Sequence, residues 1–370
     1  MSRRGIVHLS TVHRTRDNRI YNKECGALLD AGFDVTLVVR ADGPEAGPVP
    51  VVAMRTPSNR LARLTLSQAE AWRHLARLRP GLVHIHDPEL IPLAWIWART
   101  HGAKWVFDAH ENLVKQIATK PYLKPWQRGL ARAYASVLTG WADRGADGIV
   151  AATDSIAGQF RNPRTAVVFN YPWLRDFAAA PSPVPGRLVY AGDLTEERKL
   201  SFMLEVTHRL RERVPSAHLL LAGKLVGARA EAVARLIDGD VVRHLGLLPP
   251  REVPPVIASA QVGLIFLEPL PNYVTSLPTK LYEYMAAGVP FAASDFAFWR
   301  DTFGPLDAGV FVDSANVSAT VDALAELLED PSRCAVMGAR GRAAVEDRFT
   351  FEAQALRLVE LVERLGQTRR

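Results

Sequence analysis

The amino-acid sequence predicts an α/β protein with two doubly wound, Rossmann-like domains, each built on a parallel sheet. The length of 370 residues is typical of two domains. Short apolar segments alternate with amphipathic segments of helical period along nearly the whole chain, and this alternation breaks once, at residues 176–186. Continuous apolar strands separated by helices are typical of a parallel sheet that is covered on both faces.

The first predicted domain comprises residues 1–175. Its predicted strands are apolar runs at residues 5–9, 34–39, 82–86, 104–108 and 148–153. Amphipathic segments that suit helices lie between these runs. The segment DFAAAPSPVPG follows, at residues 176–186, with three prolines and a glycine and neither period. We therefore interpret it as an interdomain linker.

The second predicted domain comprises residues 187–348. Its predicted strands lie at residues 187–192, 217–223, 241–246, 262–266, 290–294 and 309–312. Residues 349–370 hold a long amphipathic helix that no strand follows. We expect this helix either to cap the second domain or to cross back to the first. Open parallel sheets bind ligands beyond the carboxyl ends of their strands, so we expect the two domains to face each other across a ligand-binding cleft.

Charge and cysteine content narrow the class of partner and the compartment. The net charge is +6, and residues 1–180 hold 24 Lys and Arg against 15 Asp and Glu, which predicts an anionic partner for the first domain. Two distant cysteines, Cys25 and Cys334, fit a reducing compartment. No apolar run suits a signal peptide or approaches the ~20 residues that span a bilayer. We expect a cytoplasmic protein that is either free or bound peripherally to the inner face of the membrane.

The segment SLPTKLYEYMAAGVPFAAS, residues 276–294, holds the strongest local signal. Pro278 and Gly288 bracket a helix of about two turns, on which Lys280 and Glu283 share a face. One interpretation is an exposed ion pair. The other is a nucleotide site, in which the helix start and the ammonium bind phosphate and the carboxylate accepts hydrogen bonds from ribose hydroxyls.

This segment resembles the donor-site signature of retaining GT-B glycosyltransferases of family 4, also called group 1. The segment VYAGDLTEERKLSFMLEVTHRLRERVPSAHLLLAG resembles the first strand–loop–helix–strand of the donor domain in that group. In the first half, HIHDPEL, VFDAHEN and TRDNRIYNKECGALLDAGFDVTLVV also resemble its members. The resemblance implies that residues 1–175 bind the acceptor and that residues 187–348 bind a nucleotide-diphosphate sugar, with no other cofactor.

The resemblance also implies roles for individual residues. Glu283 would bind the ribose, and Lys199 with its neighbour Arg198 would bind the pyrophosphate. The chain departs from the group at two positions, with Asp193 in place of an arginine and Thr275 in place of a glutamate that touches the sugar. The implied donor-binding set is Gly192, Gly223, Lys224, Leu247, Thr275, Ser276, Leu277, Lys280 and Glu283. The implied catalytic set is His110, Lys199 and Arg198.

The segment VFDAHEN admits two interpretations. Asp108 can cap a helix beside a local histidine, or His110 can lie beside the transferred sugar, as the resemblance implies. No protein nucleophile is needed, because in this group the acceptor hydroxyl attacks and the departing phosphate takes its proton. We expect no metal ion: His84 and His86 share a strand face, but no third ligand is evident in the sequence.

Two basic segments each admit two interpretations, a solvated surface or a binding role. In residues 12–20, Asp17 and Arg19 either belong to a solvated loop or contact an anionic acceptor or donor phosphate. Residues 115–144 mix basic and aromatic side chains, which suits an anionic membrane surface or an ordinary crossover helix.

The predicted function is therefore a retaining, metal-independent transferase of the hexosyltransferase type. It would move a sugar from a nucleotide-diphosphate sugar to a carbohydrate or lipid-linked acceptor in cell-surface polysaccharide or glycolipid biosynthesis. The alternatives are a nucleotide-sugar epimerase of the same fold and a catalytically inactive nucleotide-sugar-binding scaffold. Nucleic acid is not an expected partner, because the basic residues form no known reading motif.

Overall fold

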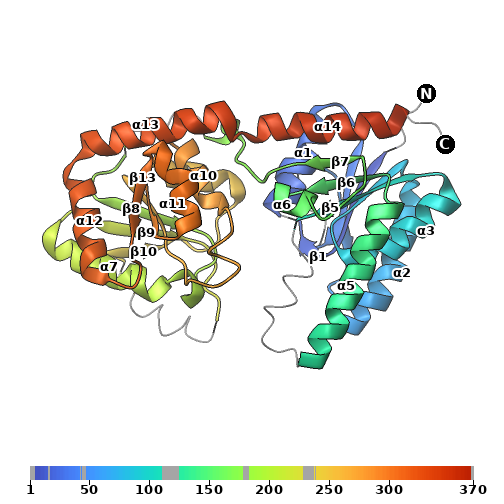
Figure 1. Cartoon of the computed structure of the whole chain (residues 1–370), viewed down its shortest axis with the longest axis horizontal. Coiled ribbons are helices and arrows are strands. Elements are labelled where there is room, and N and C mark those ends of the chain that lie inside the picture. Colours follow the sequence, from blue (N-terminus) through green and yellow to red (C-terminus); the bar gives the residue numbers. More distant parts are fainter. Residues whose placement is uncertain are drawn as a thin grey trace. The chain divides into compact units, whose positions relative to one another are not determined.

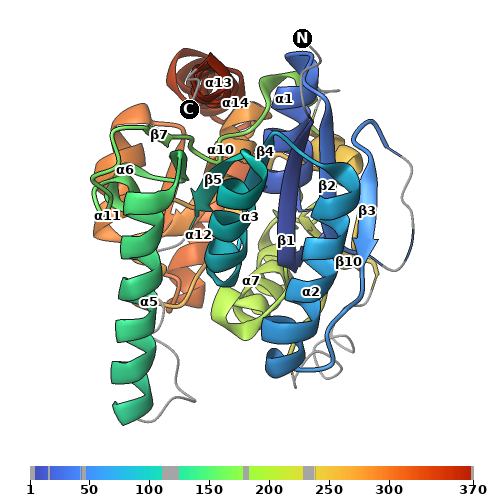
Figure 2. The ribbon, with the colours of Figure 1, turned by 90° about the vertical axis from the view of Figure 1, so that its right-hand side faces the viewer.

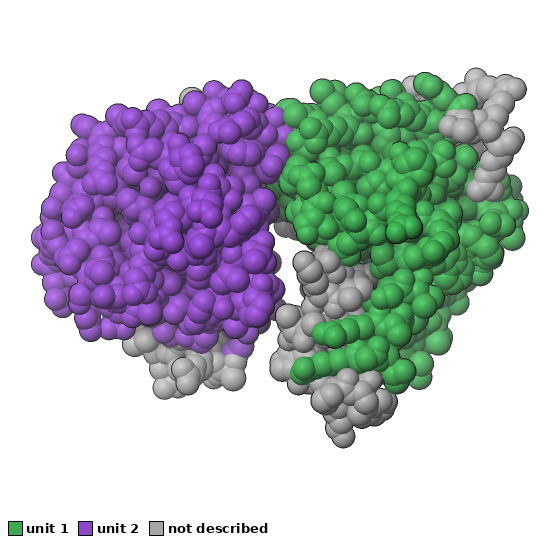
Figure 3. Space-filling model, in the orientation of Figure 1, with its two compact units in different colours: residues 1–170, 351–370 green, residues 171–350 purple. Residues whose placement is uncertain are grey.

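The computed structural model describes residues 5–15, 17–41, 43, 47–110, 125–177, 183–227, 237 and 239–367 (Figure 1). The chain divides into two compact units, drawn in different colours in Figure 3. Unit 1 comprises residues 1–170 and 351–370, and unit 2 comprises residues 171–350. Among the described residues, we find no helix whose length and apolarity would let it cross a membrane.

Unit 1 is built on a parallel sheet of seven strands in the order β3-β2-β1-β4-β5-β6-β7. All five strands predicted for this part of the chain are present. The sequence did not predict β3 and β7, which lie at the two edges of the sheet and are only four and three residues long. The strands are β1 (Ile6–Arg14), β2 (Val35–Arg40), β3 (Val51–Met54), β4 (Leu82–Ile85), β5 (Lys104–Ala109), β6 (Gly148–Ala151) and β7 (Thr165–Val167).

Helices cover the sheet of unit 1. Figure 2 shows α2, α3 and α5 side by side in front of the strands, and Trp97 of α3 is buried against Trp72 of α2. The C-terminal helix α14 packs in unit 1 against α1, β6 and β7. The helices are η1 (Asn18–Cys25), a π-helix, α1 (Gly26–Asp30), α2 (Arg60–Leu78), η2 (Pro88–Leu90), α3 (Ile91–His101), α5 (Pro125–Gly145), α6 (Asp154–Ala157) and α14 (Phe351–Gln367).

Unit 2 is built on a parallel sheet of six strands in the order β10-β9-β8-β11-β12-β13. All six predicted strands are present, and the four inner ones, β9, β8, β11 and β12, are mostly buried apolar runs. They are β8 (Arg187–Ala191), β9 (His218–Ala222), β10 (Val242–His244), β11 (Val262–Ile265), β12 (Phe291–Ser294) and β13 (Gly309–Val312).

The helices of unit 2 pack in two groups, α7 against α12 and α10 against α9 and α13. The predicted short helix between Pro278 and Gly288 is α10, with Pro278 at its N-cap. The helices are η3 (Leu174–Asp176), η4 (Glu196–Arg198), α7 (Leu200–Arg213), η5 (Pro250–Glu252), α9 (Val253–Ala258), α10 (Thr279–Ala286), α11 (Ala297–Phe303), η6 (Gly304–Leu306), α12 (Val317–Glu329) and α13 (Pro331–Arg348).

The predicted linker, residues 176–186, falls partly outside the described residues, at residues 178–182. On either side of that gap the chain is packed within unit 2. Phe177 is buried, and its carbonyl accepts a hydrogen bond from Arg342. The amide of Val184 donates to Ser259 O at 2.9 Å. The assignment of a linker stays a prediction.

Two strands of unit 2 end in glycines whose backbones approach each other closely. Gly192 follows β8 and Gly223 follows β9, and both have a φ of 148°. The amide of Gly192 donates to Ala222 O, and the amide of Gly223 donates to Gly246 O, both at 2.7 Å. A Cβ atom on Gly223 would lie 1.8 Å from the carbonyl oxygen of Gly192. Only glycine therefore fits at residue 223, for steric as well as conformational reasons.

We predict that Gly223→Ala lowers the free energy of unfolding by at least about 3 kcal/mol, because backbone must move away from the new methyl group. Gly246→Ala is the matched control: its φ is 72°, but no atom lies within 4 Å of its added Cβ. We expect the control to cost only ~1–2 kcal/mol. Urea unfolding followed by circular dichroism measures both values. Equal losses would contradict the close approach as the cause.

Candidate functional site

The first candidate site lies in unit 2 at the carboxyl end of β8, the place where parallel sheets bind ligands. Lys280, in the first turn of α10, reaches back to this strand end. A Cβ atom on Gly192 would lie 2.6 Å from Lys280 Nζ, and the ammonium stands 5.6 Å from the centre of the Tyr190 ring. Burial lowers the pKa of Lys280, although Glu283 and Asp193 act in the opposite direction. An ammonium that has lost water here is suited to binding an anion.

Glu283 lies one turn deeper in α10 and is half-buried. In the described part of the chain, Lys280 and Glu283 form no ion pair with each other within 4 Å. The structure therefore contradicts the interpretation of these two residues as an exposed ion pair. It leaves an accessible carboxylate beside a desolvated ammonium.

Two further cations flank this strand end. Arg198 donates through Nη1 to Asp193 O at 3.3 Å, and the same nitrogen lies 3.8 Å from Asp193 Oδ2. Lys199 adopts a left-handed conformation at the N-cap of α7, and its Nζ lies 2.9 Å from Glu268 Oε1. The carboxylates of Asp193 and Glu268 are 58% and 42% exposed, so these pairs are weak and an incoming anion can replace them.

The other predicted donor-binding residues lie on neighbouring loops of unit 2. Lys224 and Leu247 are exposed, next to Gly223 and Gly246. The loop that leads into α10 is held by hydrogen bonds. Thr275 Oγ1 donates to Pro271 O at 3.3 Å, and Ser276 Oγ donates to Tyr273 O at 3.0 Å. The carbonyl of Ser276 accepts from Trp299 Nε1 at 2.7 Å, and Leu277 is the next residue of the loop.

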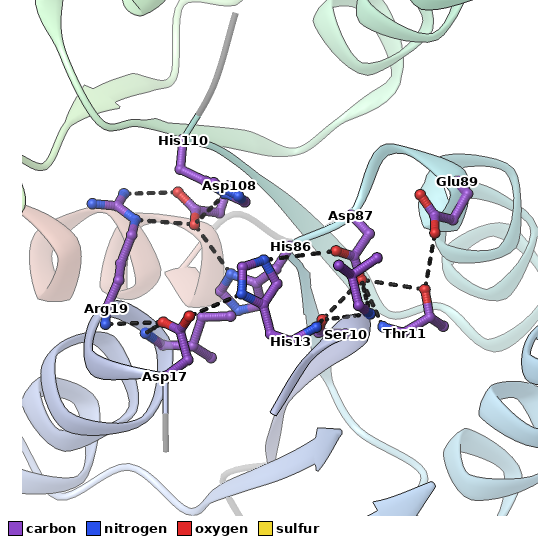
Figure 4. Close-up of polar contacts among 12 residues, drawn as sticks. Ser10, Thr11, His13, Asp17, Arg19, His86, Asp87, Glu89, Asp108 and His110 are labelled. Atoms are coloured by element: carbon purple, nitrogen blue, oxygen red, sulfur yellow. Dashed lines mark hydrogen bonds and ion pairs between the residues drawn. The ribbon is translucent and has the colours of Figure 1, made fainter. Parts of the chain in front are cut away.

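The second candidate site lies in unit 1 around His110, directly after β5. Its Nδ1 lies 3.4 Å from Asp108 Oδ2, and its side chain is 24% exposed. Figure 4 shows Asp108 between Arg19, His86 and His110. Arg19 binds both carboxylate oxygens of the buried Asp108, through Nη2 at 2.7 Å and Nε at 3.1 Å. His86 Nδ1 lies 3.1 Å from Asp108 Oδ2.

The charge of Asp108 sets the tautomer of His110. Burial would raise the pKa of Asp108, but Arg19, His110 and His86 hold it well below its usual range. An ionised carboxylate only accepts hydrogen bonds, so the ring nitrogen that faces it carries the proton. In the neutral form, this tautomer has the lone pair of His110 on Nε2. Asp108 is engaged with Arg19 and is not a free helix cap, and residues 111–124 lie outside the described residues.

Both interpretations of Arg19, a solvated loop and contact with an external anion, are wrong. Its side chain is buried, where it pairs with Asp108 and with Glu24 Oε1 at 3.0 Å, and it donates to Val168 O at 2.9 Å. Asp17 also has an internal role. It caps η1 by accepting from the amides of Arg19 and Ile20, both at 3.0 Å. Burial would raise the pKa of Asp17, but the hydrogen bonds from His13 and Ile20 lower it to about 2.

Several carboxylates near these sites were not predicted from the sequence. Asp87 is the clearest case, because it follows β4 and accepts hydrogen bonds from Ser10 Oγ at 2.8 Å and from the amides of Thr11 and Val12 at 2.6 and 3.2 Å. Its position at a strand end was a signal that could have identified it. Glu268 gave no such signal, because its partner Lys199 is distant in sequence. Glu24 lies on the same helix as its partner Arg19, but nothing in the sequence showed that both side chains are buried.

Comparison with known proteins places both units in one family. Residues 185–330 match the family described as Glycosyl transferases group 1, and residues 22–170 match the Glycosyl transferase 4-like domain. The GDP-mannose-dependent monoacylated alpha-(1-6)-phosphatidylinositol monomannoside mannosyltransferase of Corynebacterium glutamicum is 31% identical over 154 residues, which are 40% of this chain and 39% of that protein. The chain thus spans less than half the length of the curated relatives that it matches.

Solved structures resemble the whole chain. Sucrose-phosphate synthase from Thermosynechococcus elongatus has a TM-score of 0.73 at 19% identity, over 98% of this chain and 99% of that one. HepE from Anabaena in complex with UDP-glucose has a TM-score of 0.71 at 14% identity, over 98% and 100%. At these identities the likeness establishes the fold. With its two parallel sheets and the two matched segments, the chain belongs to the group 1, glycosyltransferase-4-like family of GT-B fold.

Proposed function

We propose that this protein transfers a sugar from a nucleotide-diphosphate sugar to an acceptor hydroxyl, with retention of configuration. One observation in unit 2 carries the proposal. The ammonium of Lys280 lies against Gly192 at the end of β8, while Glu283 lies one turn deeper on the same helix without an ion pair. This arrangement supports a phosphate site and a ribose site about one helical turn apart on α10.

The donor is proposed to bind along the loops of unit 2. The diphosphate accepts hydrogen bonds from Lys280, Lys199 and Arg198, and the two ribose hydroxyls donate to Glu283. Residues 275–277 and the segment from Gly223 to Lys224 border the sugar and phosphates, and Leu247 contacts the base. Because Thr275 is uncharged, the contact that a glutamate makes to the sugar in this group must come from another group here.

The chemistry is proposed to be leaving-group departure with front-face attack. Negative charge grows on the diphosphate as the glycosidic bond breaks, and preorganised cations stabilise that charge most. Arg198 and Lys199 supply this stabilisation after they exchange their ion pairs with Asp193 and Glu268 for contacts with phosphate. The acceptor hydroxyl attacks, and its proton passes to the departing phosphate. His110 would accept a hydrogen bond from a sugar hydroxyl through Nε2, and no protein nucleophile or metal ion takes part in these steps.

The substrates are proposed by analogy with the relatives. The Corynebacterium glutamicum relative is named as GDP-mannose-dependent and acts on a phosphatidylinositol monomannoside. A D-inositol 3-phosphate glycosyltransferase of Thermobispora bispora is 29% identical over 182 residues, which are 46% of this chain and 40% of that protein. We propose a hexose donor and a polar acceptor, carbohydrate or lipid-linked, in the assembly of cell-surface polysaccharide or glycolipid.

A lipid-linked acceptor would bring the protein to the inner face of the membrane. The described part of residues 115–144 is mostly α5, where Leu130, Tyr134 and Val137 are 64%, 53% and 65% exposed. They are spaced four and three residues apart, so they form one exposed apolar stripe on the helix. Such a stripe next to basic residues supports peripheral binding to an anionic membrane. The predicted contribution of residues 115–124 lies outside the described residues.

We predict that Glu283→Gln weakens binding of the nucleoside diphosphate by ~1.5–3 kcal/mol, because charged hydrogen bonds to the ribose are lost. Calorimetry with GDP, UDP and ADP first identifies the nucleotide that binds and then compares the variant. Glu326→Gln on α12 is the matched control, since its carboxylate pairs with Arg333 on the surface. Unchanged affinity in Glu283→Gln would remove Glu283 from the site.

We predict that His110→Ala lowers sugar transfer by roughly 10²-fold, the range for one lost polar group in a preorganised site. Affinity for the free nucleoside diphosphate and the melting temperature should change little. The assays use GDP-mannose and UDP-glucose with a lipid-linked acceptor, and His74→Ala on α2 is the control. Donor turnover without acceptor would favour the epimerase, and binding without turnover in the wild type would favour the scaffold. A joint fall in melting temperature and affinity would give His110 a structural role.

We predict that the wild-type protein sediments with anionic vesicles and is released by salt. Neutralising Lys120, Lys124 and Arg128 together should weaken binding by ~1 kcal/mol per charge. Replacing Leu130 and Val137 by serine should weaken it further, whereas serines at Leu61 and Leu66 of α2, which are 71% and 69% exposed, should not. Binding that ignores lipid charge and both sets of variants would contradict this role of α5.

A further inference from the structure

Three histidines and a glutamate meet in the interior of unit 1, beneath the His110 site. His8 of β1 pairs in register with His84 of β4, and His86 follows on the same face two residues later. The ring centre of His8 lies 4.5 Å from that of His84 and 5.2 Å from that of His86. Glu24 of η1 joins them, and all four side chains are fully buried. The sequence showed no third ligand beside His84 and His86, but folding brings His8 and Glu24 to them.

A chain of hydrogen bonds fixes which nitrogen of His8 is bare. Asp108 is ionised, so His86 Nδ1, at 3.1 Å, must donate to it. His86 Nε2 then accepts from His8 Nδ1 at 3.0 Å. In neutral His8 the proton is thereby used, and Nε2 keeps its lone pair. That atom is buried and has no hydrogen-bond partner.

Two more atoms without a hydrogen-bond partner belong to His84 and Glu24, which lie next to His8. His84 Nε2 and Glu24 Oε2 are buried without a hydrogen-bond partner among the described residues, whereas Glu24 Oε1 pairs with Arg19 Nε at 3.0 Å. His84 Nε2 lies 3.7 Å from Glu24 Oε2, which is too long for a hydrogen bond. Two ligands at ~2.0–2.1 Å from one tetrahedral zinc ion lie about 3.4 Å apart, close to this spacing. Ligand atoms of His8, Glu24 and His84 all lie within 4.8 Å of one another.

The charge of the surroundings also favours a cation. Glu24 and Asp108 contribute two buried carboxylates, and Arg19 is the one cation that pairs with both among the described residues. Two carboxylates beside a single guanidinium are costly in a low-dielectric interior, and a bound cation or a proton on Glu24 would relieve that cost. Burial raises the pKa of Glu24, so an ion at this site would take the place of that proton.

Glu24, His86 and Asp108 form a second set of neighbouring groups, whose ligand atoms also lie within 4.8 Å of one another. It is less suitable, because protons already satisfy it: Arg19 binds both oxygens of Asp108, and His86 is hydrogen-bonded at both nitrogens. These groups instead resemble an outer shell, in which a ligating histidine donates its other N–H toward a carboxylate.

We propose that His8, His84 and Glu24 bind a divalent transition-metal ion of the zinc class inside unit 1. Two imidazoles and one carboxylate are a ligand set that such ions favour. The ion would join β1, β4 and η1, and its outer shell of His86 and Asp108 would connect it to the base of His110. The inference does not rest on the donor site in unit 2 or on the proposed transfer reaction.

The test begins with the wild-type protein, purified without chelator and dialysed. Elemental analysis should find one zinc, iron or similar ion per chain. Removal by a strong chelator should lower the melting temperature, and added Zn²⁺ should restore it. Cobalt substitution should give the visible absorption of a low-symmetry Co²⁺ site with nitrogen ligands. A metal-free wild type whose melting temperature ignores chelator and Zn²⁺ would overturn the proposal and would mean that a proton on Glu24 balances the charge.

Glu24→Gln and His84→Asn then locate the ion, and each should lose it. His74→Asn is the control, because His74 and Glu70 form a partly buried pair at 3.9 Å that could bind zinc adventitiously. Retention of metal in both ligand variants and its loss in the control would also overturn the proposal. If the ligand variants fail to fold, the metal content and cobalt spectrum of the wild type still decide the question.

Discussion

The buried guanidinium of Arg19 is the constraint on which unit 1 depends. Removing a charge from water costs several kcal/mol unless partners satisfy it. Arg19 has those partners in Asp108, Glu24 and the Val168 carbonyl, which come from β5, η1 and the segment after β7. These three parts of the chain must close on one side chain together, because displacement of any of them leaves the buried guanidinium without a counterion or a hydrogen-bond acceptor.

This constraint reaches the candidate site through Asp108. Because Arg19 holds both carboxylate oxygens, Asp108 cannot rotate to follow its other neighbours, and His86 and His110 must orient toward it. The buried carboxylate of Asp108 thus sets the tautomer of His110, whose side chain is partly exposed. A polar core of this kind does little for net stability compared with apolar packing, so its value lies in geometry. That value is clearest at a position where one ring nitrogen must stay available.

The sequence predicted what depends on local pattern and missed what depends on distant pairing. Eleven strands were predictable from apolar runs, and the short edge strands β3 and β7 were not. Lys280 and Glu283 were identified as candidates because they lie on one helix between Pro278 and Gly288, but the contact of Lys280 with Gly192 arises only from folding. Arg19 was misjudged because charged residues are usually exposed, and its partner Asp108 is 89 residues away.

The buried pairing of Arg19 also changes how the positive net charge of the first half should be interpreted. Its excess of basic residues predicted an anionic partner, yet Arg19 is neutralised inside unit 1 and Lys23 donates to Asn170 Oδ1 at 2.6 Å. Neither can attract a ligand. In unit 2, by contrast, Arg198 and Lys199 pair with exposed carboxylates and can exchange them at little cost. Formal charge therefore overstates the attraction of unit 1 for anions, and exposure of each cation's partner is the better guide to where an anion binds.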